Sequence, residues 1–126
     1  MTGSLPEGCQ ILIVEDELLI ALLLQETLED EGCRIIGPVG RVGEAVLMVR
    51  QGGIDAAVLD AGLNGEPVTA VADALEAGNV PFVFHSGYGP EHLPLSHRHR
   101  PLLRKPCNPS DVVAALSEAI GKGGQR

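Results

Sequence analysis

The alternation of short apolar runs with helical stretches constrains the fold of this chain more than any other feature. The apolar runs cover 10–15, 34–39, 56–60, 81–86 and 101–105, and the helical stretches cover 17–31, 42–51, 66–77 and 109–120. The first and third runs are almost unbroken in hydrophobicity, which is typical of strands covered on both faces. Strands that alternate with helices through short connections predict an α/β fold, a doubly wound parallel sheet of five strands with helices on both sides.

The stretch between the last two strands, "GYGPEHLPLSHRHR", breaks this pattern. It contains Pro90 and Pro94 and no sustained helical period, so we expect the fourth connecting helix to be short or irregular. Its histidines and arginines are interpreted as a solvated basic patch, because exposed loops without a fixed carboxylate or cysteine rarely bind a transition metal. The acidic side chains of Asp73 and Glu76, on the preceding helical stretch, are also expected to face solvent.

The first helical stretch contains more leucine than one buried stripe requires. Ile20, Leu23, Leu24 and Leu28 share one face, and the face is extended by Leu18, Leu19 and Leu22. Two interpretations stay open, a wide face that packs on the core, or an apolar surface that docks a partner helix or a second copy of the chain.

Size and charge limit the class of protein. The chain has 126 residues, 44% of them hydrophobic, which predicts one globular domain over 1–126 with a core at about 9–121 and no output domain. The net charge of −8 disfavours nucleic acid and anionic membrane surfaces as partners. The sequence shows no signal peptide, no membrane-spanning run and no cysteine spacing for disulfides or zinc. We therefore expect a cytoplasmic protein, a monomer or a weak homodimer.

Polar residues follow four of the predicted strands at the point where each strand ends. They are Glu15 and Asp16, Asp60, Ser86 and Lys105. Each has an ordinary explanation alone, as a helix cap, a turn residue or a surface lysine. Because ligands of an open parallel sheet bind beyond the carboxyl ends of its strands, we expect these residues to lie together.

Carboxylates brought together in this way repel one another unless a cation joins them. Magnesium prefers oxygen ligands and commonly bridges carboxylates to a phosphoryl group. The Lys105 ammonium and the Ser86 hydroxyl are suited to bind phosphoryl oxygens. The set predicts aspartyl phosphorylation, in which Asp60 attacks phosphorus and the surrounding groups neutralise the developing charge.

The motifs "ILIVEDE", "AVLDAGLNG", "FHSGYG" and "LRKP", in this order, resemble those of the receiver domains of two-component response regulators. "FHSGYG" is similar to the Phe-Ala-Thr-Gly-hydrophobic-Tyr motif of a subgroup common among stand-alone alphaproteobacterial receivers. The resemblance implies a flavodoxin-like sheet with strand order 2-1-3-4-5. It also implies that Asp60 accepts a phosphoryl group from the phosphohistidine of a sensor histidine kinase or a histidine phosphotransfer protein.

The same resemblance assigns the site residues. Magnesium, or manganese, would be held by Glu15, Asp16, Asp60 and the backbone carbonyl of Gly62. The phosphoryl group would be held by Ser86 and Lys105, and the bond from Lys105 to Pro106 would be cis.

The chain also departs from the family pattern. Leu102 stands where receivers usually carry the aromatic residue that turns inward on phosphorylation, which leaves Ser86 and Tyr88 as switch candidates. His85 replaces the alanine of the subgroup motif, and Cys107 stands where phenylalanine is frequent.

The function that these observations favour is a phosphorylation-switched signalling protein that changes its downstream partner and turns over no small substrate. One alternative is a small phosphotransferase or phosphatase working through an aspartyl phosphate. It is disfavoured because phosphatases of the haloacid dehalogenase type carry an aspartate two positions after the nucleophile, where this chain has Gly62. Another alternative is a degenerate receiver that only binds proteins.

Overall fold

The computed structural model describes residues 5–123 and contains one five-stranded parallel sheet. Its strands are β1 (Gln10–Val14), β2 (Arg34–Val39), β3 (Ala56–Asp60), β4 (Phe82–Ser86) and β5 (Leu102–Arg104). Its helices are α1 (Leu18–Asp30), α2 (Val42–Gln51), α3 (Thr69–Ala77) and α4 (Pro109–Gly123). The strand order is β2-β1-β3-β4-β5. The predicted fold class is therefore confirmed, while both ends of the predicted domain, 1–4 and 124–126, lie outside the described residues.

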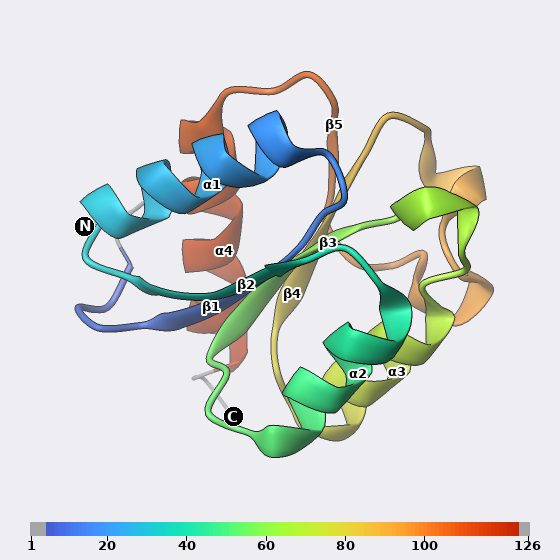
Figure 1. Ribbon diagram of the computed structural model, residues 1–126, viewed down its shortest axis with the longest axis horizontal. Helices are drawn as coiled ribbons and strands as arrows, with labels where there is room; N and C mark the ends of the chain where they lie inside the picture. Colours follow the sequence, from blue (N-terminus) through green and yellow to red (C-terminus); the bar gives the residue numbers. More distant parts are fainter. Residues whose placement is uncertain (1–4, 124–126) are drawn as a thin grey trace.

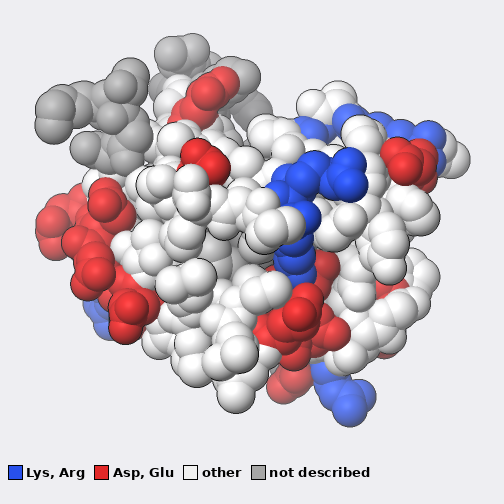
Figure 2. All heavy atoms as spheres, turned by 90° about the horizontal axis from the view of Figure 1, so that it is seen from above, with Lys and Arg blue, Asp and Glu red and all other residues white. Residues whose placement is uncertain are grey.

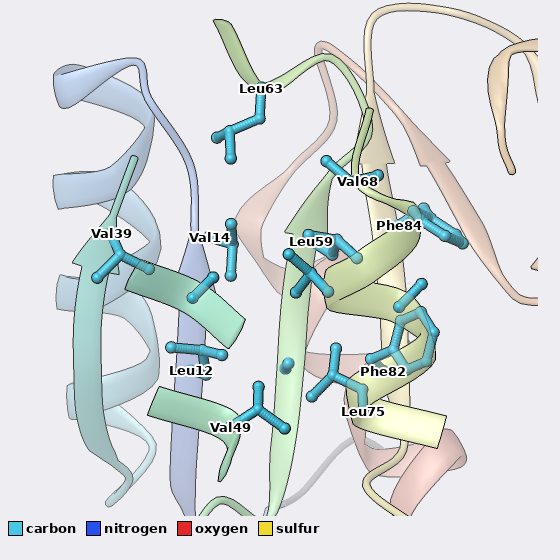
Figure 3. Packing of buried hydrophobic residues seen from close by; sticks show 14 of the residues in the cluster. Leu12, Val14, Val39, Val49, Leu59, Leu63, Val68, Leu75, Phe82 and Phe84 are labelled. Carbon is cyan, nitrogen blue, oxygen red and sulfur yellow. The ribbon is translucent and has the colours of Figure 1, made fainter. Parts of the chain in front are cut away.

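The sheet separates two layers of helices, α1 with α4 on one side and α2 with α3 on the other (Figure 1). Alternate side chains along each strand point to opposite layers. Leu12 and Leu59 pack under α2 and α3 together with Phe82 and Phe84 (Figure 3), whereas Ile13 packs under α1 and α4. Since both faces are covered, β1 and β3 read as unbroken apolar runs in the sequence.

One helix begins later than its pattern predicts. The expected helix 66–77 begins at Thr69, because Glu66 is held in an extended conformation before Pro67. Within the described residues, no helix is both long and apolar enough to cross a membrane.

The connection from β4 to β5 contains two short 3-10 turns, Pro90–His92 and Leu95–His97, in place of a helix. The prediction of a short or irregular fourth helix is confirmed. The prediction of a solvated patch is wrong for His97, whose side chain is 1% exposed and bonds to Asp73 on α3. The sequence pattern missed this contact because its two partners lie on different elements.

Helix α1 buries a narrower face than the leucine pattern predicts. Ala21, Leu24 and Leu28 are buried at helical spacing, but Leu23 is 51% exposed. The three leucines that extend the predicted face, Leu18, Leu19 and Leu22, are 69%, 81% and 48% exposed. The first turns of α1 therefore present an apolar surface to solvent.

Candidate functional site

Carboxylates from two neighbouring strands meet at the carboxyl edge of the sheet. Asp60 ends β3, and the pairing of Val14 with Leu59 places Glu15 beside it. Both side chains are buried, each residue only 4% exposed. Carboxylate oxygens of Glu15, Asp16 and Asp60 all lie within 4.8 Å of one another.

The ammonium of Lys105 lies among these carboxylates. Its Nζ is 3.1 Å from Glu15 Oε2, 3.2 Å from Glu17 Oε1 and 3.4 Å from Asp60 Oδ2. Figure 2 shows basic side chains reaching into a group of acidic ones on this face of the molecule. Lys105 follows β5 and its backbone N–H donates to the Ser86 carbonyl at 2.7 Å, and the peptide bond to Pro106 is cis. The edge of the sheet thus aims the lysine at the acidic cluster.

Backbone groups hold two of the carboxylates in place. The N–H of Gly62 donates to Asp60 Oδ1 at 2.8 Å, and the N–H of Asn64 donates to Asp16 Oδ2 at 3.0 Å. Asn64 has a left-handed backbone (φ 46°), and its side chain donates to the Gly40 carbonyl at 3.3 Å. The Gly62 carbonyl accepts a long bond of 3.4 Å from the N–H of Gly65, and its role as a metal ligand stays a prediction.

The charges at this edge shift the pKa values of their neighbours. Burial, followed by the negative charge of Asp60, raises the pKa of Glu15 to about 7, although Lys105 acts in the opposite direction. Burial alone would lower the pKa of Lys105, but Asp60, Glu15 and Glu17 together raise it. The acidic cluster therefore carries more negative charge than one lysine neutralises.

A hard divalent cation fits this cluster chemically. Carboxylate oxygens are the ligands that magnesium prefers, and a second cation would offset the burial and the repulsion from Asp60 that together raise the pKa of Glu15. The buried Oε1 of Glu15 accepts no hydrogen bond from any described residue, and the cationic group nearest to it among them is Lys105 Nζ at 3.1 Å, so this oxygen has capacity for another partner. A hollow of about 360 Å³ opens beside Glu15 and Asp16, is bordered by Leu18, Leu22 and Arg41, and gives access to these two carboxylates.

The predicted hydroxyl and switch residues lie at different depths. Ser86 is fully buried, and its Oγ accepts a hydrogen bond from the Tyr88 N–H at 3.0 Å. Among the described residues, no hydrogen bond joins this hydroxyl to Asp60 or Lys105. The Tyr88 ring is largely exposed and lies against His92 in a tilted arrangement, with ring centroids 4.7 Å apart. Leu102 is half-buried against the core under α2 and α3.

Three residues at this edge were not predicted as site residues. Glu17 pairs with Lys105, Asn64 holds Asp16, and His85 lies beside Glu15 with Nδ1 3.9 Å from Oε1. Glu17 could have been found from its place directly after the acidic pair. His85 could have been found by counting along β4, because every second residue faces the same helical layer.

Comparison with known proteins gives the family. SdrG from Sphingomonas melonis is 44% identical, with a TM-score of 0.78 over 92% of this chain and 98% of SdrG. A response regulator receiver protein from Sinorhizobium medicae is 25% identical, with a TM-score of 0.79 over 93% of this chain and 98% of that one. This chain belongs to the response regulator receiver family. SdrG has also been solved in a BeF3-activated conformation, which is 43% identical with a TM-score of 0.73 over 92% of this chain and 98% of that one.

Longer regulators contain a similar part. The phyllosphere-induced regulator PhyR from Methylorubrum extorquens is 34% identical over 88% of this receiver chain, which spans only 43% of PhyR. PhyR from Bartonella quintana, described as an anti-anti-sigma factor, is 32% identical with a TM-score of 0.76 over 94% of this chain and 50% of that one. No family model matches the chain.

One further receiver shares the fold and carries a metal. The receiver domain of a sensor histidine kinase from Pseudomonas aeruginosa is 23% identical, with a TM-score of 0.79 over 90% of this chain and 98% of that one. In that structure a magnesium ion is coordinated in the active site cleft.

Proposed function

We propose that this receiver is a phosphorylation switch: Asp60 accepts a phosphoryl group with the help of magnesium, and the phosphorylated chain exchanges protein partners. The observation that carries the proposal is the convergence of Glu15, Asp16 and Asp60 with Lys105 at one edge of the sheet. The BeF3-activated form of SdrG supports it by similarity, because beryllofluoride is a mimic of a phosphoryl group.

The contacts of Asp60 indicate which oxygen reacts. Oδ1 is held at 2.8 Å by the Gly62 N–H, whereas Oδ2 lies 3.4 Å from Lys105 Nζ. Oδ2 therefore forms the new bond to phosphorus while the phosphorus–nitrogen bond of the donor phosphohistidine breaks. The donor imidazole leaves with the electron pair and takes a proton. Lys105 then neutralises a phosphoryl oxygen at the same place.

The metal ligands would be Glu15, Asp16, Asp60 and the Gly62 carbonyl. When bound, magnesium supplies positive charge to the transferring phosphoryl oxygens. The chain contributes the fixed positions of the ligands, through the backbone bonds to Asp16 and Asp60.

The signal is read out by the connection between β4 and β5, because Leu102 offers no aromatic ring to turn inward. Ser86 Oγ now accepts the Tyr88 N–H. A phosphoryl group on Asp60 that draws this hydroxyl toward it would release Tyr88 and the turns that follow it. The output is a change of binding surface, without turnover of a small substrate.

The partners follow from the site and from the relatives. The phosphoryl donor is a histidine kinase or a histidine phosphotransfer protein. A surface for this donor is offered by the exposed leucines of α1, because Leu18 and Leu22 border the hollow that leads to Glu15 and Asp16. The name of the PhyR relative points to regulators of sigma factors as candidate downstream partners. We also propose that the protein is cytoplasmic.

Saturation with beryllofluoride and magnesium, followed by NMR or calorimetry, tests the proposal. Wild type and the surface control Asp111→Asn should bind saturably, and Asp60→Asn should not. Binding that survives in Asp60→Asn would refute Asp60 as the acceptor.

Radiolabelled acetyl phosphate separates the competing functions. Stable labelling of Asp60 supports the switch, and failure to label supports a degenerate receiver. Steady hydrolysis of small phosphate esters faster than roughly 1 per second would instead make the chain an enzyme.

A further inference from the structure

His85 is a buried polar residue on the same layer of the sheet as the acidic cluster. It pairs with Asp60 across β3 and β4, so both side chains point toward α1 and α4. Glu15 lies on the other side of Asp60 in the same row. Only 4% of His85 is exposed. A histidine at this place has no simple packing explanation, because an apolar residue would fill the same space without polar atoms.

The two ring nitrogens of His85 face different partners. Nε2 lies 3.5 Å from the Sγ of Cys107, and Nδ1 lies 3.9 Å from Oε1 of Glu15. Nδ1 and Oε1 are both buried, and neither has a hydrogen bond to any residue between 5 and 123. Oε1 is 3.1 Å from Lys105 Nζ, but the bonds of Lys105 and of the Glu17 N–H go to Oε2. Nδ1 and Oε1 are thus two neighbouring buried atoms that both lack a hydrogen bond.

We propose that His85 is a positioning residue of the acidic site, whose Nδ1–H donates to Glu15 Oε1 while its Nε2 accepts from the Cys107 thiol. The proposal rests on the proposed function, since it assigns a partner to one of the magnesium ligands. Closing the gap from 3.9 Å to hydrogen-bond length takes a movement of about 1 Å. Burial raises the pKa of Cys107, so its thiol keeps the proton that it donates.

The consequence concerns the orientation of Glu15. Lys105 is the cation now closest to Oε1, and it is also the group expected to turn to a phosphoryl oxygen. A hydrogen-bond donor that stays on Oε1 keeps this oxygen of Glu15 fixed and holds the other oxygen, Oε2, in one orientation toward the metal site. Partners of this kind typically change metal affinity by about tenfold or more when they are removed.

The proton position on His85 can be read directly by NMR of the ring nitrogens in the metal-free protein. The expected result is a neutral ring protonated at Nδ1. His97 provides an internal reference with the opposite arrangement, because its Nδ1 accepts from Arg100 and its Nε2 contacts Asp73. A proton at Nε2 of His85 would overturn the proposal.

Magnesium affinity provides the second measurement. His85→Ala should weaken binding about tenfold. His85→Asn places an amide near the position of Nδ1 and should restore affinity, whereas His85→Gln places its amide near Nε2 and should not. The Asn and Gln pair decides the matter even where the alanine variant fails to fold. Wild type that binds no magnesium refutes the proposed function, whereas wild type, Ala and Gln variants with equal affinity refute the role of His85.

Discussion

The two buried histidines of this chain, His85 and His97, lie in opposite helical layers and differ in how well their polar atoms are satisfied. His97 is 1% exposed and both of its ring nitrogens have hydrogen-bond partners. His85 is 4% exposed and has one weak contact with a thiol and one unpartnered nitrogen. A buried group without a partner destabilises the folded state, so the difference separates a structural histidine from one placed at a site.

The surroundings of His97 fasten the connection between β4 and β5 to the rest of the molecule. Its Nε2 lies 2.8 Å from Asp73 on α3, and its Nδ1 accepts from Arg100 at 3.2 Å. Arg100 also donates to Glu76 at 3.1 Å and lies 4.2 Å above the Phe82 ring. Three of these four contacts join the connection to α3 or β4, so the cluster stabilises the fold, and it lies on the opposite side of the sheet from Glu15 and Asp60.

At the edge that carries Glu15 and His85, like charges and unpartnered atoms gather instead. Such an arrangement is destabilising by itself and persists where a ligand compensates for it. Variants of the His97 cluster should therefore change the stability of the fold, whereas variants of the Glu15 and Asp60 cluster should change ligand binding.

The largest effect is expected from His97→Ala. Loss of a buried ring together with its hydrogen bonds should lower the free energy of unfolding by about 2–4 kcal/mol, measured by urea denaturation. Magnesium affinity should stay as in wild type, and the exposed neighbour variant His99→Ala should change stability little. A loss below about 1 kcal/mol would mean that the His97 cluster does not hold the fold.

Magnesium should stabilise the edge with the carboxylates and leave the His97 cluster unaffected. At a concentration a hundredfold above its dissociation constant, it should raise the free energy of unfolding by about 2.7 kcal/mol. His97→Ala should gain the same increment as wild type, because distant sites act additively. Asp60→Asn should gain much less, and an equal gain in that variant would place the ion elsewhere.

Glu15 should make the metal-free protein less stable as pH rises. Its pKa is about 7 in the folded state and 4.5 when unperturbed, so the folded state retains the proton longer. Relative to Glu15→Gln, the free energy of unfolding of wild type should fall between pH 4.5 and about 7 and then stay constant.

The total change in this difference should be on the order of 3 kcal/mol. Burial lowers the pKa of His85, which destabilises both proteins as pH falls below 6.5 and so acts in the opposite direction to Glu15. Urea denaturation in the presence of a chelator across this pH range measures the effect. A difference that is independent of pH would show that Glu15 is ionised throughout.

The contrast also shows what the sequence could predict. The carboxylates and Lys105 were predictable because each ends or follows a strand, and parallel strands bring their carboxyl ends to one edge. The partners of His85 and His97 depend on which helix layer each side chain meets and on contacts between distant elements. The alternation of side chains along β4 predicts which helix layer His85 meets. The position of His97 could not be predicted in this way, because it lies in an irregular connection without a repeating pattern.

The smallest effect is expected from Asp73→Asn, and it tests what kind of bond holds His97. The Asp73 side chain is 62% exposed, so solvent screens its charge, and an asparagine keeps an oxygen that can accept from Nε2. The free energy of unfolding should therefore fall by less than about 0.5 kcal/mol in urea denaturation. Because Arg100 donates to Nδ1, what position 73 has to supply is a hydrogen-bond acceptor for Nε2, which asparagine also offers. A loss of stability as large as that of His97→Ala would show that Asp73 and His97 form an ion pair. His85 and His97 would then differ in charge as well as in their partners.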